Sequence, residues 1–178
     1  MILWLASYPK SGNTFVRALL SNYLNDENID AFTKMKGIQS FPKKNSFEGI
    51  VNEDLIKKDK YQLFKYFLSA QRKINENNKL NFVKTHNFFG STNGYEFTNK
   101  ENTAGAIHIV RDPRSVAVSY AYHADISFEK SIDLLLMERR IGLNDGCYPE
   151  ARMSWKIHFQ SWLKCSFPKL LIKYGQIP

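Results

Sequence analysis

Apolar and polar residues alternate in a way that predicts a strand, a loop and a helix at the start of the chain. The run 1–7, MILWLAS, is apolar on both faces, which is typical of a buried parallel strand. The polar segment 8–14 contains a proline and a glycine and predicts a tight loop. In 15–24, FVRALLSNYL, apolar residues repeat every four positions. This spacing predicts a helix with a wide apolar stripe that a sheet must cover. The stripe has two rows, one of Phe15, Leu19 and Tyr23 and one of Val16, Leu20 and Leu24.

The same patterns continue along the chain. Apolar runs predict further strands at 80–86, 104–110 and 168–173. Helical spacing predicts helices at 60–74, from Pro113 onward, at 128–142 and at 155–162. Strands that alternate with helices predict an α/β fold of three layers, with a mostly parallel sheet between helices. No internal repeat or low-complexity linker interrupts residues 1–178, so we expect a single domain.

Two segments between these elements predict loops. The segment 33–48 carries four lysines around a glycine and a proline, and 88–103 contains two glycines. For 33–48 we consider two interpretations. The segment is either a solvated basic face or a wall of a ligand pocket, to which Phe41 and Phe47 would supply apolar contacts.

Composition narrows the class of protein. A chain of 178 residues with 43% hydrophobic residues is long and apolar enough to bury a core. No apolar run approaches the roughly 20 residues of a membrane span. The first residues do not resemble a signal peptide, so we expect a cytoplasmic protein with Cys147 and Cys165 as free thiols. No Cys/His spacing suggests a metal site, and the net charge of +8 favours an anionic partner.

The loop after the first strand, YPKSGNT, has the chemistry of an anion site. Gly12 lets the backbone approach a ligand, and the free N–H groups at the helix start attract negative charge. Lys10 adds a full positive charge. Ser11, Asn13 and Thr14 add donors. The alternative is an ordinary turn in which serine and asparagine cap the helix.

The strand at 80–86 ends in Lys84-Thr85-His86. Alternate residues of a strand face the same side, so Lys84 and His86 would lean toward one cleft. That cleft would lie at the carboxyl end of the strand, where open α/β sheets bind ligands. The alternative for His86 is a capped or exposed histidine without a chemical role.

A second candidate anion site follows the strand at 104–110. Arg111 stands at the strand end, and Pro113 suits the first turn of a helix with Asp112 as its cap. Ser119 lies two turns into that helix. A guanidinium beside a hydroxyl suits a phosphate, because its planar fork contacts two oxygens. The alternative is an Arg–Asp pair that only stabilises the turn.

At these residues the chain resembles a known family. YPKSGNTF is similar to the 5′-phosphosulfate loop of the cytosolic-type sulfotransferases, commonly YPKSGTTW. Those enzymes move a sulfonate group from 3′-phosphoadenosine 5′-phosphosulfate (PAPS) to a hydroxyl or an amine. The resemblance implies that Phe15 stacks on the adenine, where the family commonly has tryptophan. Asn13 stands where threonine is commoner in the family.

Three later segments extend the resemblance. KTH is similar to the family segment in which the histidine, here His86, is the general base and the lysine, here Lys84, contacts the sulfonate. RDPRSVAVS resembles the 3′-phosphate motif, which implies that role for Arg111 and Ser119. Tyr174 matches a tyrosine that touches the adenine. The family's later Arg-Lys-Gly loop has no match here, so we expect the chain to cover only part of the family fold.

These observations predict one sulfotransferase-like domain over 1–178, with a P-loop-NTPase-like fold and without a metal. Lys10 would stabilise the leaving phosphate oxygen, while Lys84 and Thr14 would hold the transferred group. The partner would be a small acceptor. A nucleotide-binding protein without sulfonate transfer, kinase-like or binding-only, is the alternative. A kinase would need Gly-Lys-[Ser/Thr] and an acidic magnesium ligand, and the sequence shows neither clearly. A nucleic-acid-binding protein would need a basic stripe, whereas the cations of this sequence stand at strand ends and in scattered loops.

Overall fold

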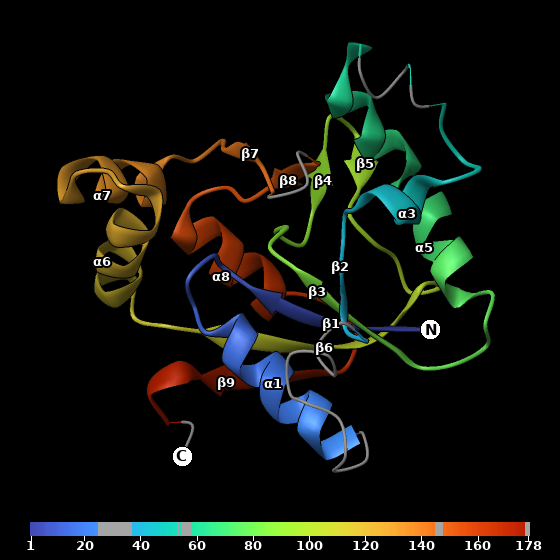
Figure 1. Cartoon of the computed structure of the whole chain (residues 1–178), viewed down its shortest axis with the longest axis horizontal. Coiled ribbons are helices and arrows are strands. Elements are labelled where there is room, and N and C mark those ends of the chain that lie inside the picture. Colours follow the sequence, from blue (N-terminus) through green and yellow to red (C-terminus); the bar gives the residue numbers. More distant parts are fainter. Residues whose placement is uncertain (25–36, 53, 55–57, 145–147, 177–178) are drawn as a thin grey trace.

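A five-stranded parallel sheet forms the centre of the protein (Figure 1). The computed structural model describes residues 1–24, 37–52, 54, 58–144 and 148–176. The strand order is β2-β3-β1-β6-β9, and all four neighbouring pairs are parallel. The bounds of these strands are β1 (Ile2–Ser7), β2 (Gln39–Ser40), β3 (Asn81–Thr85), β6 (Thr103–Val110) and β9 (Lys169–Lys173).

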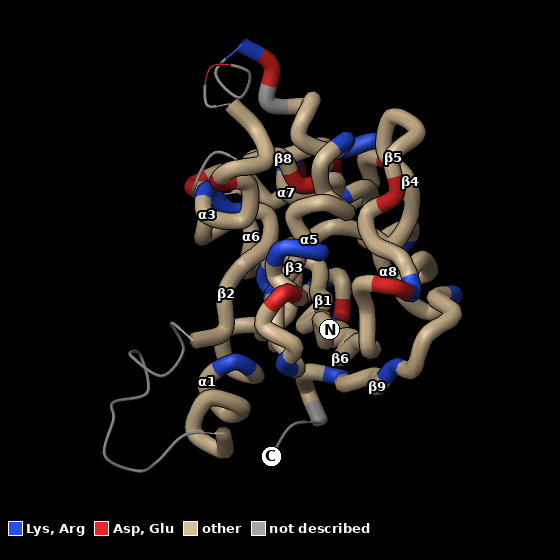
Figure 2. Tube along the Cα trace, turned by 90° about the vertical axis from the view of Figure 1, so that its right-hand side faces the viewer, with Lys and Arg blue, Asp and Glu red and all other residues tan. Residues whose placement is uncertain are grey.

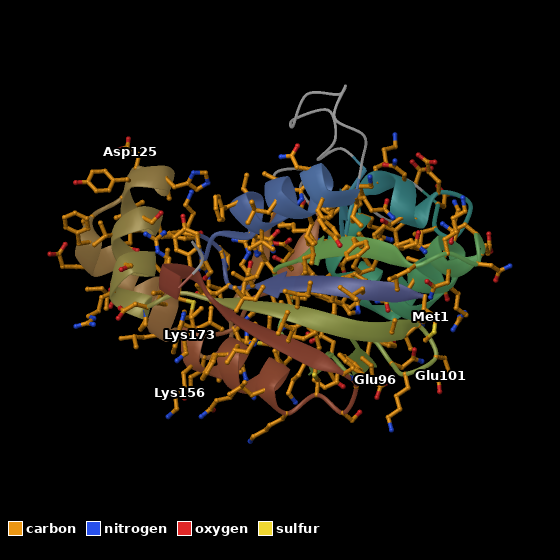
Figure 3. All side chains as sticks on the ribbon, turned by 90° about the horizontal axis from the view of Figure 1, so that it is seen from below. Met1, Glu96, Glu101, Asp125, Lys156 and Lys173 are labelled. Carbon is orange, nitrogen blue, oxygen red and sulfur yellow. The ribbon has the colours of Figure 1, made fainter. Side chains whose placement is uncertain are left out.

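Helices connect the strands, and two short antiparallel hairpins lie outside the sheet. The hairpins are β4 (Ser91–Thr92) with β5 (Tyr95–Glu96), and β7 (Ile141–Leu143) with β8 (Pro149–Ala151). The helices are α1 (Asn13–Leu24), α3 (Lys44–Phe47), η1 (Lys60–Tyr66), α5 (Phe67–Asn75), α6 (Pro113–Ala124), α7 (Phe128–Leu136), α8 (Trp155–Leu163) and η2 (Tyr174–Gln176). Helices α1 and α8 lie on opposite sides of the sheet (Figure 3), so the α/β architecture of three layers is confirmed.

The core lies on one face of β1. Alternate residues of this strand, Ile2, Trp4 and Ala6, are fully buried in a mainly aromatic cluster. The Trp4 ring lies 5.8 Å from the Phe41 ring and 4.8 Å from the Phe97 ring, between ring centroids. Aromatic pairs at such separations add to the free energy of burial. This packing fixes β1, whose carboxyl end leads into the YPKSGNT loop.

One of the two predicted rows of α1 is exposed. Phe15, Leu19 and Tyr23 are exposed by 41%, 48% and 88%. In the second row, Val16 is 5% exposed and Leu20 is half-buried, whereas Leu24 is 48% exposed. The four-residue spacing predicted the helix, but the buried part of its surface is narrower than the predicted stripe.

Segments predicted as loops contain regular structure. β2 and α3 lie within 33–48, of which 33–36 fall outside the described residues. Phe41 and Phe47 are buried core residues, which excludes both a solvated face and a pocket wall for them. The β4–β5 hairpin lies in 88–103, and the helix predicted at 128–142 ends at Leu136. Strands of two or three residues are too short to show a period in the sequence.

Other expectations concern single features. The sequence prediction for Cys147 lies outside the described residues, while Cys165 is buried and has a free thiol. Among the helices that the structure describes, none is long and apolar enough to cross a membrane. A search of the same residues finds no group of three or more His, Cys, Asp or Glu side chains that could hold a metal ion.

Candidate functional site

The parallel register brings the candidate residues to one edge of the sheet. Ala6 of β1 lies beside Thr85 of β3, and Val110 of β6 lies beside Lys173 of β9. β1 and β6 are themselves neighbours in the same direction. The segments that follow these four strands therefore leave the sheet at its carboxyl edge, where such folds bind ligands (Figure 1). They carry Lys10, His86, Arg111 and Tyr174.

The first loop has a strained backbone. Lys10 and Gly12 have φ angles of 66° and 94°, in the left-handed region. The Ser11 N–H donates to the Tyr8 carbonyl at 3.3 Å, so the loop forms a tight turn before α1. The Ser11 hydroxyl is fully buried and has no hydrogen-bond partner among the described residues. Strain and an unsatisfied buried donor are both concentrated at functional sites in proteins.

Asn13 anchors the loop to the strand. Its side-chain amide donates to the Leu5 carbonyl at 2.9 Å and to the Ser7 hydroxyl at 3.1 Å. These bonds fix the start of α1 against β1. The predicted role of Asn13 as a ligand donor is not tested by this geometry, which instead shows a positioning role. Thr14 is exposed beside it.

The two predicted anion motifs are in direct contact. The Arg111 guanidinium donates from Nη1 to the carbonyl of Lys10 at 3.1 Å. The same guanidinium lies 5.0 Å from the centre of the Tyr174 ring, and the Phe15 ring meets that ring edge-on at 6.3 Å. A Cβ added to Gly12 would overlap the Tyr174 ring. Residues that are far apart in the sequence thus form one continuous surface.

The alternative Arg–Asp pair is formed by a different arginine. Asp112 caps α6 by accepting from the Arg114 N–H at 2.8 Å. It also accepts from the Arg114 guanidinium, and these contacts lower the pKa of Asp112 to about 2. Arg111 is therefore not needed to stabilise the turn. Ser119 is half-buried in the second turn of α6 and makes no side-chain hydrogen bond to the part of the chain that the structure describes.

The geometry of His86 makes one ring nitrogen available as a base. Its Nδ1 lies 2.7 Å from the Ser7 carbonyl oxygen, which can only accept, so Nδ1 carries the proton. The lone pair is then on Nε2. Burial and the nearby charge of Lys84 lower the pKa of His86 well below its ordinary value, although the Ser7 carbonyl opposes the shift. His86 is therefore neutral at pH 7.

Sequence reasoning missed a buried polar cluster beside the first loop. Arg140 is 8% exposed and donates to the Tyr8 hydroxyl at 3.2 Å and to the Tyr120 hydroxyl at 2.5 Å. Tyr8 opens the first loop, 132 positions before Arg140. Such a contact leaves no local pattern in the sequence. The cluster steadies the loop from its inner side.

His158 lies behind His86. Its side chain is 1% exposed, and its ring lies 5.6 Å from the Tyr8 ring. Burial and the neighbouring His108 lower the pKa of His158, while the backbone of Asn87 and of His86 opposes the shift. The ring therefore lies against the backbone that carries His86.

On the side of the described chain that Figure 2 shows, lysine and arginine positions are scattered over several elements, with acidic residues between them. Nucleic-acid binding proteins usually gather such charges on one face. At the carboxyl edge, the Arg111 guanidinium contacts the backbone of Lys10.

Comparisons with known proteins agree with this geometry. The family model described as the sulfotransferase domain matches residues 2–174. Among solved structures, the chain is similar to retinol dehydratase in complex with retinol and PAP, with a TM-score of 0.51, and with androsterone and PAP, with a TM-score of 0.54. It is also similar to mouse sulfotransferase SULT7A1 complexed with PAP, with a TM-score of 0.52.

The matched structures have low sequence identity to this chain and are about twice as long. Identity is 20% in each case, which supports the fold alone. The matches cover 96% of this chain for both retinol dehydratase structures and 98% for the mouse protein. They cover 53% of the retinol dehydratase chains and 50% of the mouse protein, so the chain spans about half their length. A search of curated protein sequences gave no significant match.

Proposed function

Because the chain belongs to the sulfotransferase domain family, we propose that it binds PAPS and transfers the sulfonate group to a hydroxyl or amine of a small acceptor. The hydrogen bond from the Arg111 guanidinium to the Lys10 carbonyl carries the proposal, because it joins the two anion motifs at one edge. A nucleotide with phosphates at both ends of its ribose needs two such cationic groups close together. PAPS is a substrate here, and we propose no metal.

The residues at this edge fit such a donor. Lys10 and the N–H groups at the start of α1 would hold the 5′-phosphosulfate, and the unsatisfied Ser11 hydroxyl adds a donor nearby. Arg111, with Ser119, would hold the 3′-phosphate. The exposed Phe15 ring, with Tyr174 at its edge, would contact the adenine.

His86 would begin the chemistry by taking a proton from the acceptor on Nε2. The acceptor oxygen or nitrogen then bonds to sulfur, and the bond from sulfur to the 5′-phosphate oxygen breaks. Lys10 would stabilise the negative charge that grows on that leaving oxygen. The product 3′-phosphoadenosine 5′-phosphate (PAP) would then be released. Lys84 and Thr14 would hold the oxygens of the transferred sulfonate. The proton ends on His86, so atoms and charge balance.

The domain proposal follows from the same observations. The sheet, the helices on its two sides and one aromatic cluster belong to a continuous stretch without an internal division. We therefore propose that residues 1–178 form a single sulfotransferase-like domain. The part that the structure describes contains the proposed donor-binding residues of both motifs.

Calorimetry that compares the affinities of the protein for PAP and for ATP tests the proposal. The 178-residue protein should bind PAP and should bind ATP at least tenfold more weakly, because ATP lacks a 3′-phosphate for Arg111. Lys10→Ala should weaken PAP by about 10- to 100-fold, the usual effect of losing a hydrogen bond to a charged group. Binding of ATP as tight as that of PAP would contradict the proposal.

A matched control separates local from general charge effects. Lys100 is exposed and lies before β6, at the opposite edge of the sheet. Lys100→Ala removes the same charge but should leave the affinity for PAP unchanged. Equal losses in the two variants would mean that only the net charge of +8 attracts the nucleotide.

A further inference from the structure

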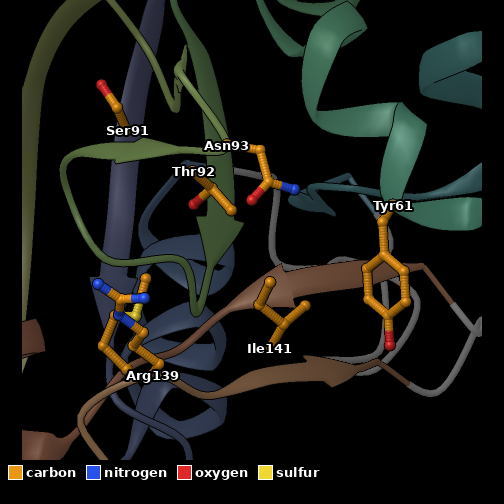
Figure 4. Close-up of a pocket in the computed structure, with 7 residues that line it drawn as sticks. Tyr61, Ser91, Thr92, Asn93, Arg139 and Ile141 are labelled. Atoms are coloured by element: carbon orange, nitrogen blue, oxygen red, sulfur yellow. The ribbon is translucent and has the colours of Figure 1, made fainter.

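A cavity of about 660 Å³ lies between the two hairpins (Figure 4). Its volume is within the range of pockets that bind small molecules. No part of the predicted donor motifs lines it. Its walls come from η1, from the β4–β5 hairpin and from the segments around β7 and β8, through Tyr61, Ser91, Thr92, Asn93, Arg139, Ile141 and Met153.

The cavity is joined to the segment that carries His86. The Ala151 N–H donates to the side-chain oxygen of Asn87 at 2.9 Å, and the Ala151 carbonyl accepts from the Phe88 N–H at 2.8 Å. β8 is therefore fixed to the two residues that follow His86. Met153 comes two residues after Ala151, a distance of at most about 7 Å along the chain. One wall of the cavity thus belongs to a segment that is hydrogen-bonded to the residues directly after the proposed general base.

The chemistry of the lining is amphipathic. Ile141 and Met153 supply apolar surface, and the hairpin residues supply hydroxyl and amide groups. In Figure 4, Arg139 and Tyr61 stand at opposite ends, with Ile141 between them. The cavity would therefore suit an elongated molecule with an apolar body and a polar end.

Arg139 is the distinctive group of this lining. The guanidinium of its neighbour Arg140 is bonded to two tyrosine hydroxyls, and that of Arg152 forms an ion pair with Glu150 at 2.8 Å. Arg139 is exposed and has no hydrogen bond or ion pair with any residue in the described ranges. A guanidinium prefers a planar, bidentate anion such as a carboxylate or sulfate.

We propose that this cavity binds the acceptor, and that the acceptor carries an anionic group contacted by Arg139. The inference rests on the proposed function and names the class of its second substrate: an amphipathic molecule with a hydroxyl or amine and a carboxylate or similar anion. The net charge of +8 would draw such a molecule toward the protein. Arg139 would then favour it over a neutral molecule of the same shape.

Two matched probes test the anionic preference. Para-hydroxyphenylacetate and para-cresol share a phenol but differ in the carboxylate. With methyl-labelled methionine, the NMR signal of Met153, assigned through Met153→Leu, should shift on addition of either probe. We expect half-saturation with the carboxylate probe at a concentration at least fivefold lower than with para-cresol. Equal concentrations would overturn the anionic preference, and no shift with either probe would overturn the cavity as a site.

Variants identify the group responsible. Arg139→Gln should remove the fivefold preference while the shift caused by para-cresol stays the same. Arg72→Gln removes an exposed arginine of α5 outside the cavity and should keep the preference. Retention of the preference in Arg139→Gln would overturn the assignment of Arg139.

The titrations are run with and without PAP, whose binding is measured in the same samples. Probe binding at Met153 in a protein that does not bind PAP would overturn the acceptor role and the proposed function, leaving only a ligand cavity. PAP binding without any Met153 shift would overturn this inference while the proposed function stands.

Discussion

The proposed donor edge and the proposed acceptor cavity are built in different ways. The donor edge follows the ends of long, paired strands, and its members contact one another across about 100 positions, as Arg111 and Lys10 do. The cavity is lined by a short 3₁₀ helix and by hairpins whose strands have two or three residues. Rigid strands suit residues that must hold the donor in a fixed position, whereas residues on hairpins can be substituted without disturbing the sheet.

The two regions should also differ in how well they tolerate substitutions. The first loop has two residues with positive φ, and its glycine lies against Tyr174, so few side chains could replace it. The cavity is lined by ordinary side chains such as Ile141 and Met153, which tolerate replacement. We therefore expect large effects from changes at the donor edge and at His86, and effects on selectivity alone from changes in the cavity.

The largest effect should come from His86, which follows β3 at the carboxyl edge of the sheet. His86→Asn removes the base that would take the acceptor proton, and we expect turnover to fall by about 10²- to 10⁴-fold. The affinity for PAP should not change, because the donor edge stays intact. Transfer from labelled PAPS and calorimetry measure the two quantities. His123→Asn, at an exposed position of α6, is the control and should keep full activity.

The pH dependence follows from the lowered pKa of His86. Only neutral His86 can accept a proton, so the rate should be constant near pH 7 and fall only well below 6.5, as His86 becomes protonated. Lys84→Met removes a charge that lowers this pKa, so the fall should move to higher pH. A rate that falls as pH rises from 7 to 8, or full turnover in His86→Asn, would exclude His86 as the base.

The next largest effect should come from the glycine of the donor edge. A Cβ at Gly12 would overlap the Tyr174 ring and would sit at a φ of 94°. A strained backbone of this kind costs about 1–3 kcal/mol, and displacement of the ring adds to it. Gly12→Ala should therefore lower the affinity for PAP at least tenfold, as measured by calorimetry.

Two variants show which cause dominates. Gly49 has a φ of 72° but no atom near its missing Cβ, so Gly49→Ala adds strain without a clash and should leave the affinity for PAP unchanged. Tyr174→Ala should itself weaken the binding of PAP, because the ring belongs to the proposed adenine contact, so it serves as the reference for the double variant. Adding Gly12→Ala to Tyr174→Ala should cost less affinity than Gly12→Ala costs in the original protein, because the clash is gone; equal costs would mean that the ring is not the obstacle.

The sequence predicted the strands that end at the proposed donor edge, but it did not predict the cavity. β1, β3, β6 and β9 were predicted from their apolar runs, which are typical of parallel strands, although β9 is an edge strand with mostly exposed residues. Arg111 and Lys10 were expected to converge, and they are in contact. The chemical roles assigned to them remain predictions. The convergence was predictable because parallel strands end at the same edge of a sheet.

The cavity, the buried face of α1 and the Arg140 cluster depend on contacts that leave no local pattern in the sequence. β7 and β8 are too short to show a period, so Arg139 was assigned to a helix and not to a cavity wall. The width of the buried stripe of α1 was overestimated, because spacing identifies a helix but not what covers it. Tyr8 and Arg140 meet across 132 positions, and neither residue indicates the other.

The smallest effect should come from the link between the two regions. Arg140 contacts Tyr8 of the first loop, and its sequence neighbour Arg139 lines the cavity. Tyr8→Phe removes one hydroxyl that accepts from the buried guanidinium, which should lower the free energy of unfolding by about 1–2 kcal/mol in urea. Because Tyr8 opens the loop, PAP should also bind about two- to fivefold more weakly, a shift of under about 1 kcal/mol.

Tyr120→Phe is the matched change on the other side of the same guanidinium. It removes a hydroxyl that accepts from Arg140 at 2.5 Å, so the loss of unfolding free energy should be similar. Tyr120 lies in α6 rather than in the first loop, so the affinity for PAP should stay unchanged. If both variants weakened PAP equally, the Arg140 cluster would act through general stability. A loss in Tyr8→Phe alone would show that the cluster positions the donor loop itself.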